Sequence, residues 1–143
     1  MDKKKIFVWA LIAFVVFVFV QSLVFKFLGH EQTDIIFTTI AQWMETVGLG
    51  FIAPAFASVG GYVIGITELI ASGLLIFIGT RRLGALLGAA VISGAIFFHL
   101  CTPLGVDRII DSAGNTDGGQ LFYMACGVWI SCVLIFFLTK KAQ

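Results

Sequence analysis

Four long runs of apolar residues dominate the sequence and leave few folds open to it. They occupy residues 6–28, 59–79, 83–101 and 121–138, and Lys26 and Glu68 are the acidic or basic residues inside them. A helix needs roughly 17–25 mostly apolar residues to cross the hydrocarbon core of a bilayer. Backbone polar groups there must pair internally, so a spanning segment is a helix or a barrel strand. These runs are about twice as long as a barrel strand, so they predict four transmembrane helices.

The composition points the same way. Apolar residues make up 59% of the 143 residues and charged residues 12%, against roughly 45–50% and about 25% in soluble domains. Because so few charges cannot cover a water-facing surface, we expect the surface to face lipid. The net charge of +1, without a basic stripe, argues against nucleic acid as a partner. The first run lacks a small-residue cleavage site, so we interpret it as a retained helix and not as a signal peptide.

The basic residues predict the orientation of the helices. Seven of the nine form three clusters at the ends of the apolar runs. They are Lys3, Lys4, Lys5, Arg81, Arg82, Lys140 and Lys141. With four crossings all three clusters fall on one side of the membrane, and the positive-inside rule makes that side the cytoplasm. We therefore expect both termini to be cytoplasmic.

The connections on the opposite, outer side are long. Apolar residues recur at helical spacing within residues 34–47, which predicts an amphipathic helix in the outer membrane interface, between the first two spans. Residues 102–120 read as an ordered outer loop. In this loop Arg108, with Asp107 and Asp111, is expected to form a salt bridge, and the less favoured alternative is an anion site on the outer side. Lys26 is expected to extend to the headgroups. The whole chain, residues 1–143, is thus expected to form one all-α membrane domain.

Polar side chains inside the spans are the candidate functional residues, because lipid makes them costly to keep. Counting 1.5 Å per residue from the inner turn places Glu68 roughly 18 Å and His99 roughly 24 Å above it. Gln21 and Tyr123 come out at similar heights by the same count. We therefore expect Gln21, Glu68, His99 and Tyr123, one from each helix, to form a polar layer in the outer half of the bundle.

Small residues predict which faces of the second and third spans meet. They form stripes with GxxxG spacing, which lets two helix backbones approach closely. The stripes comprise Gly61, Gly65, Ser72 and Gly79 on the second span and Gly84 and Gly88 on the third. Glu68 shares the first stripe, so it should point at a neighbouring helix and not at lipid.

Two roles are open to the polar layer. A buried carboxylate near an imidazole can relay protons, and a quinone headgroup would find donors in Gln21, His99 and Tyr123 and protons at Glu68. Alternatively these side chains bond only to one another and hold the helices in register, at about 0.6–2 kcal/mol each. The three cysteines form no CxxC and no metal-ligand spacing with the histidines, so no metal site is expected.

Several segments resemble the DoxX family of small bacterial membrane proteins. They are GITELIASGLLIFIGTRRLGALLGA at residues 65–89, AIFFHLCTPLG at 95–105, DGGQLF at 117–122 and, more loosely, FKFLG at 25–29. The family shows a Glu-Leu pair before a glycine-rich apolar helix, a Gly-x-x-Arg turn and an Ala/Leu-rich helix. The resemblance covers nearly the whole chain and implies a four-helix bundle in the bacterial plasma membrane.

The resemblance also implies a function beside other proteins. The name-giving members are the small subunit of a thiosulfate:quinone oxidoreductase, and others accompany redox or thiol-stress systems. Glu68, Arg81 or Arg82, and His99 match the family positions. We therefore expect a small membrane subunit beside a redox partner, offering a quinone or proton site, and leave open whether it is itself an enzyme. The alternatives are a structural or assembly subunit without its own chemistry and, less favoured, a small transporter or proton pathway.

Overall fold

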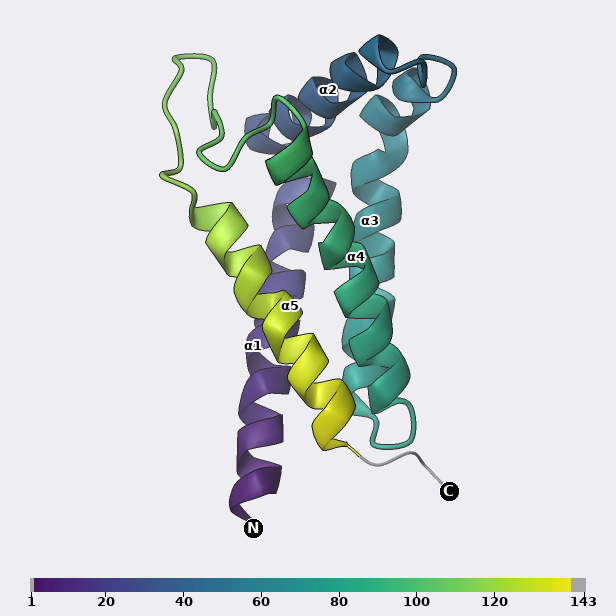
Figure 1. Cartoon of the computed structure of the whole chain (residues 1–143), viewed down its shortest axis with the longest axis vertical. Helices are drawn as coiled ribbons and strands as arrows, with labels where there is room; N and C mark the ends of the chain where they lie inside the picture. Colours follow the sequence, from purple (N-terminus) through teal and green to yellow (C-terminus); the bar gives the residue numbers. More distant parts are fainter. Residues whose placement is uncertain (1, 140–143) are drawn as a thin grey trace.

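The computed structural model describes residues 2–139 and contains, in that range, five helices and no strand. The helices are α1 (Lys3–Phe27), α2 (Glu31–Thr46), α3 (Ala53–Ile76), α4 (Arg81–Cys101) and α5 (Gln120–Leu138). Four of them, α1, α3, α4 and α5, are long and apolar enough to cross a membrane. They form a bundle with α2 lying across one end (Figure 1). The predicted all-α bundle with four membrane-length helices is confirmed for this part of the chain.

Both ends of α3 differ from the predicted span by three residues or more. The helix α3 begins at Ala53, six residues before the predicted span 59–79, with Pro54 in its first turn. Proline is favoured there because the N–H it lacks would have no partner in the helix anyway. The same helix ends at Ile76, so Gly79 lies in the turn to α4 and not on the packing stripe.

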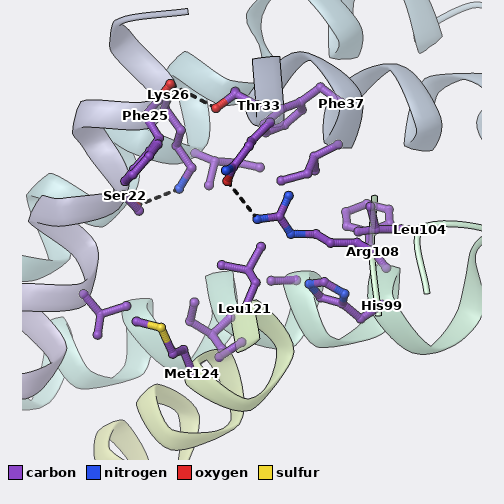
Figure 2. Close-up of a pocket in the computed structure, with 18 of the residues that line it drawn as sticks. Ser22, Phe25, Lys26, Thr33, Phe37, His99, Leu104, Arg108, Leu121 and Met124 are labelled. Atoms are coloured by element: carbon purple, nitrogen blue, oxygen red, sulfur yellow. Dashed lines mark hydrogen bonds between the residues drawn. The ribbon is translucent and has the colours of Figure 1, made fainter. Parts of the chain in front are cut away.

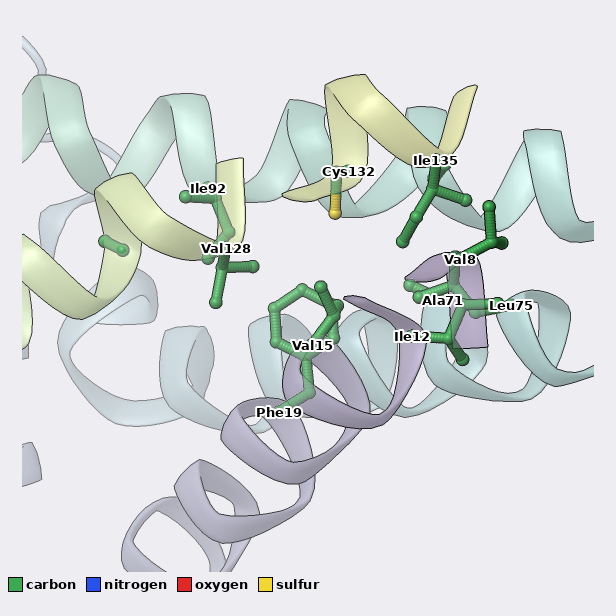
Figure 3. Close-up of a cluster of buried hydrophobic side chains, with 12 residues drawn as sticks. Val8, Ile12, Val15, Phe19, Ala71, Leu75, Ile92, Val128, Cys132 and Ile135 are labelled. Atoms are coloured by element: carbon green, nitrogen blue, oxygen red, sulfur yellow. The ribbon is translucent and has the colours of Figure 1, made fainter. Parts of the chain in front are cut away.

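An apolar core joins all four long helices. Every third or fourth residue of α1 is buried, namely Val8, Ile12, Val15 and Phe19, which is the spacing of one helix face. Figure 3 shows this face against Ala71 and Leu75 of α3 and Val128, Cys132 and Ile135 of α5. Most of the other apolar side chains of α1 are exposed, as expected of a surface that meets lipid.

Glycines lie where helices approach most closely. A Cβ atom added to Gly84 would lie 2.7 Å from the backbone nitrogen of Leu75 and 2.9 Å from the carbonyl oxygen of Ala71. Gly88 likewise faces α5 and α1, since an added Cβ would lie 3.0 Å from the sulfur of Cys132. The two backbones of α3 and α4 therefore touch at Gly84, with no room for a side chain between them.

The remaining members of the predicted stripe face other helices. A Cβ added to Gly61 would meet Phe37 of α2 at 3.2 Å, and one added to Gly65 would meet Leu23 of α1 at 3.0 Å. Ser72 donates to the carbonyl oxygen of Glu68 in its own helix at 2.8 Å. The stripe on α3 thus serves α1 and α2, whereas Gly84 alone provides the closest approach of α4.

The turn between α3 and α4 carries a structural arginine. Arg81 is buried, and its Nε and Nη2 atoms donate to the carbonyl oxygens of Leu75 at 3.0 Å and Ile76 at 3.4 Å. Its guanidinium lies 4.5 Å from the centre of the Trp9 ring. Arg81 therefore satisfies carbonyl groups at the end of α3 and joins it to α1. Among the seven basic residues that predict the orientation, Lys140 and Lys141 lie outside the described residues.

The helix α2 packs on the bundle through its apolar face. Ile40, Ala41 and Met44 form a second core cluster with Ala53 and Leu104. The observed helix Glu31–Thr46 begins three residues before the predicted one at 34–47. The apolar face that the periodicity predicts for this helix therefore packs against the rest of the protein.

Candidate ligand-binding cavity

A cavity of about 590 Å³ lies at the α2 end of the bundle. All five helices and the loop between α4 and α5 contribute to its wall, which is mostly apolar. Ligand sites in proteins have volumes of roughly 300–1,000 Å³ and combine apolar walls with a few polar groups. The charged side chains that line this cavity are Lys26, Glu68, Arg108 and Asp117. The cavity therefore has the size and wall composition of a small-molecule site.

An ion pair forms one part of the wall. Glu68 is only 4% exposed, and its Oε2 atom lies 2.5 Å from Lys26 Nζ. Ser22 donates to the same oxygen at 2.8 Å, and Lys26 donates to Ser22 at 3.0 Å. Ser22 and Lys26 are four residues apart on α1, which places them on the same face of the helix. One turn of α1 thus supplies both partners of the carboxylate.

The expectation that Lys26 extends to the headgroups is wrong. Its side chain is 15% exposed and ends at Glu68. A buried carboxylate needs a counter-charge and hydrogen bonds to offset the lost hydration, and Lys26 provides both. A signal was present in the sequence, because Lys26 and Glu68 are the cation and the anion inside the apolar runs.

His99 is held by the loop that follows its own helix. The ring is 4% exposed, and its Nδ1 atom lies 2.6 Å from the carbonyl oxygen of Gly105. Because a carbonyl oxygen can only accept, Nδ1 carries the hydrogen. A neutral imidazole with its hydrogen on Nδ1 has an acceptor lone pair on Nε2. His99 is thus able to accept a hydrogen bond or a proton at Nε2, and would donate there only when protonated.

Arg108 enters the cavity from the α4–α5 loop and is 6% exposed. Its Nη2 atom donates to Gln32 Oε1 of α2 at 3.2 Å, drawn as a dashed line in Figure 2. Its Nε atom lies 3.0 Å from Asp117 Oδ2, an ion pair whose alignment is not that of a hydrogen bond. The third nitrogen, Nη1, is buried and has no hydrogen-bond partner within residues 2–139.

The electrostatic environment of Arg108 combines two opposed effects. Burial lowers the pKa of its guanidinium, while the charge and the hydrogen-bonding capacity of Asp117 raise it. An arginine side chain keeps its proton in proteins, so Arg108 remains a cation with Asp117 as its counter-ion. The cavity therefore contains a fixed, charged donor.

Backbone hydrogen bonds within the loop between α4 and α5 position Arg108. The Arg108 carbonyl oxygen accepts from the backbone N–H of Asp117 at 3.1 Å, and Ile109 and Thr116 form an antiparallel bridge. This pairing brings Arg108 beside Asp117. The expected salt bridge of Arg108 within the loop is present, but its partner is Asp117. The carboxylates of Asp107 and Asp111 instead accept backbone N–H groups within the loop.

The carboxylate of Asp111 holds the tip of the loop between α4 and α5. Asp111 accepts from the side chain of Asn115 at 2.7 Å and from two backbone N–H groups. The bonds from Asn115, first its side chain and then its backbone, lower the pKa of Asp111. These bonds keep the loop that carries Arg108 in an ordered turn.

The structure brings together three of the four residues of the predicted polar layer. Gln21, Glu68 and His99 line the same cavity, whereas Tyr123 does not. The Tyr123 side chain is 65% exposed, and its ring packs on Phe122. On α5 the face that lines the cavity runs through Gln120, Leu121, Met124, Ala125 and Val128, so the helical rotation at position 123 points its side chain away.

Sequence reasoning missed Arg108, Asp117 and Gln32 as cavity residues. They lie in the loop and in α2, where counting heights along a span has no meaning. The backbone bridge between Ile109 and Thr116 within the loop and the packing of α2 decide their positions.

Together the fold and the cavity define a class: an all-helical, multi-pass type of membrane protein with a ligand-sized, mostly apolar pocket between its helices that contains a few charged and polar side chains. No family model, curated protein or solved structure matches the chain. Within residues 2–139 no group of three or more His, Cys, Asp or Glu side chains is placed to hold a metal ion. The geometry of the cavity therefore carries the functional argument.

Proposed function

We propose that this chain is a small DoxX-like membrane subunit that works beside a redox partner and binds the headgroup of a lipid-soluble quinone. The observation that carries the proposal is a cavity of about 590 Å³ lined by Glu68, His99 and Arg108, which has a buried donor without a partner within residues 2–139. The rest of its wall is mostly apolar, which suits a ring and the start of an apolar tail.

The polar groups of the wall fit a quinone headgroup. Its two carbonyl oxygens accept hydrogen bonds, and Arg108 Nη1 is a buried donor without a partner within residues 2–139. Gln21 and Gln120 add amide donors to the same wall. The reduced form bears hydroxyl groups, and neutral His99 can accept from one of them at Nε2. When bound, a quinone supplies the capacity to carry two electrons.

In this proposal His99 and Glu68 have different roles from those expected from the sequence. His99 becomes the group that holds a proton, because its Nε2 atom accepts in the neutral ring. Glu68 is already bonded to Lys26 and Ser22. Its role in the proposal is to balance the charge of Lys26 in the wall and to keep the wall of α1 and α3 in place.

We further propose an orientation with both termini in the cytoplasm of a bacterium and the cavity in the outer half of the plasma membrane. Lys3, Lys4 and Lys5 form the first turn of α1, and Arg81 and Arg82 begin α4 at the same end of the bundle (Figure 1). The positive-inside rule favours the cytoplasm for that end. In this orientation α2, with Glu31 and Asp34 in its first turn, lies in the outer interface.

The test is direct binding of decylubiquinone and of its reduced form, decylubiquinol, to the purified protein in lipid nanodiscs, measured by calorimetry. We expect His99→Asn to weaken the binding of decylubiquinol, because the variant lacks Nε2, the atom that accepts from a hydroxyl group of the reduced form, while the asparagine can still donate to Gly105. The loss of one hydrogen bond predicts a decrease of about three- to tenfold. Tyr123→Phe is the matched control and should bind like the parent, since Tyr123 does not line the cavity.

Absence of binding to the parent protein would overturn the proposal. So would equal binding of decylubiquinol by the parent and by His99→Asn. Stable co-purification with a larger membrane complex in that case would favour the alternative of a structural or assembly subunit.

A further inference from the structure

We propose that Arg108 and its counter-ion Asp117 make the cavity select uncharged ligands with an oxygen acceptor over anionic ones. The inference rests on the proposed function and names the ligand class of the same site. It assigns a specificity role to two loop residues that no pattern in the spans indicates.

The first step is the charge balance of the wall. Two cations, Lys26 and Arg108, and two anions, Glu68 and Asp117, line the cavity. Each cation has its own anion, at 2.5 Å for Lys26–Glu68 and 3.0 Å for Arg108–Asp117. With His99 neutral the wall carries no net charge. An anionic ligand would therefore bring an uncompensated charge into a cavity with a mostly apolar wall, where such charges are disfavoured.

The second step is the donor that remains. Buried polar groups almost always have a hydrogen-bond partner, yet Arg108 Nη1 has none within residues 2–139. A carbonyl oxygen of an uncharged ligand would complete the set of bonds without changing the charge of the wall. In Figure 2 the guanidinium extends into the space between Ser22 and Lys26 on one side and His99 on the other, where a ligand in the cavity would reach it.

The third step is the fixed position of the guanidinium. Gln32 of α2 accepts from Nη2 at 3.2 Å, and Asp117 lies beside Nε. Asp117 is held in turn, since its Oδ1 atom accepts from the backbone N–H of Gly119 at 2.9 Å and its Oδ2 atom from that of Leu121 at 3.4 Å. The start of α5 and the helix α2 thus hold Arg108 from two sides and leave Nη1 for the ligand.

The experiment compares two probes with apolar tails of equal length. Decylubiquinone is uncharged and has carbonyl acceptors, whereas decane-1-sulfonate carries a permanent negative charge. Binding of both to the protein in phosphatidylcholine nanodiscs is measured by equilibrium dialysis at neutral pH. We expect decylubiquinone to bind at least about tenfold more tightly than the sulfonate, the loss expected when one charge in the cavity stays unbalanced.

Asp117→Asn should change this preference. The asparagine oxygen can still accept from the N–H of Gly119, so the start of α5 is kept, but Arg108 loses its counter-charge. We expect the affinity for decane-1-sulfonate to rise by about tenfold or more. Asp111→Asn is the matched control, because it changes the net charge equally on the same loop but does not line the cavity. The asparagine oxygen can still accept from the backbone N–H groups of Ala113 and Asn115, so the turn of the loop is kept. Asp111→Asn should leave both affinities unchanged.

A second variant tests the donor itself. Arg108→Met/Asp117→Asn removes both charges together, so neither is left unpaired. We expect decylubiquinone to bind about tenfold more weakly, with the sulfonate still excluded. Circular dichroism and gel filtration establish that each variant is folded.

Each contrary result has its own meaning. If decane-1-sulfonate binds the parent as tightly as decylubiquinone, or gains equally from Asp111→Asn, selection by charge is overturned. If the double variant binds decylubiquinone like the parent, the role of Arg108 is overturned while the quinone site stands. If neither probe binds the parent, the proposed function fails together with this inference.

Discussion

At the scale of single residues, the pair of Glu68 and Lys26 places two opposite charges in the wall of the cavity. Both charges lose hydration in the wall of the cavity, and their attraction and the bonds to Ser22 offset that loss. Such a pair adds little to stability compared with apolar residues of the same size, but removal of one partner leaves a buried charge alone. The two residues should therefore be strongly coupled.

The coupling predicts an ordered set of variants. Lys26→Met should lower the free energy of unfolding by about 3 kcal/mol, because Glu68 would be left buried without a counter-charge. Glu68→Gln should cost less, about 1–2 kcal/mol, since glutamine still accepts a hydrogen bond and the Lys26 side chain is the less buried of the two. The double variant Lys26→Met/Glu68→Gln should lie within about 1 kcal/mol of the parent.

Unfolding in mixed detergent micelles, followed by circular dichroism, measures these differences. If the effects of the two single substitutions simply add in the double variant, the pair is not energetically coupled, and the ion pair has no role in holding the wall.

At the scale of helices, the contact between α3 and α4 depends on one missing side chain. The backbone of Gly84 lies against that of Ala71 and Leu75. Backbone atoms inside a helix cannot move aside as the end of a flexible side chain can, so the distance between the two helices depends on this glycine. Gly73, in contrast, has nothing within 4 Å of an added Cβ.

Gly84→Ala and Gly73→Ala therefore form a matched pair with opposite expectations. Gly84→Ala should lower the free energy of unfolding by about 1–3 kcal/mol, because the helices must separate or shift. Gly73→Ala should leave it unchanged or raise it by up to about 1 kcal/mol, because alanine favours the helix and meets no neighbour. Detergent unfolding measures both, and equal effects at the two positions would contradict the close α3–α4 contact.

At the scale of the whole molecule, the four long helices alternate in direction. The start of α1, the turn between α3 and α4 and the end of α5 therefore lie at one end of the bundle, and the cavity, α2 and the loop between α4 and α5 lie at the other (Figure 1). A membrane around this bundle separates the two ends. The cavity therefore faces whichever side of the membrane the α2 end faces.

Cysteine labelling tests the proposed orientation. Ser112→Cys in the α4–α5 loop and Gly79→Cys in the α3–α4 turn are placed in a variant with Cys101→Ser and Cys126→Ser, while the buried Cys132 remains. A membrane-impermeant maleimide should label Ser112→Cys in intact cells and Gly79→Cys only after permeabilisation. The reverse pattern would place the cavity on the cytoplasmic side, and labelling of both in intact cells would contradict the four-span bundle.

The sequence alone determined the number of long helices, their approximate ends and the residues between which they turn. These features depend on apolar length and on local backbone chemistry, which neighbouring residues control. It also singled out Glu68 and His99, because a polar group inside an apolar run is visible without any knowledge of its surroundings. Both side chains line the cavity.

Only the tertiary structure decided which polar groups meet. The pairing of Lys26 with Glu68 depends on how α1 is rotated against α3, and the entry of Arg108 depends on the self-paired loop. Tyr123 does not line the cavity because side chains point in directions that rotate by about 100° around the axis from one residue of a helix to the next. Two residues at the same height on different helices therefore need not face the same space. Height along a helix is a local property, whereas rotation and partner choice follow from the packing of all the helices together.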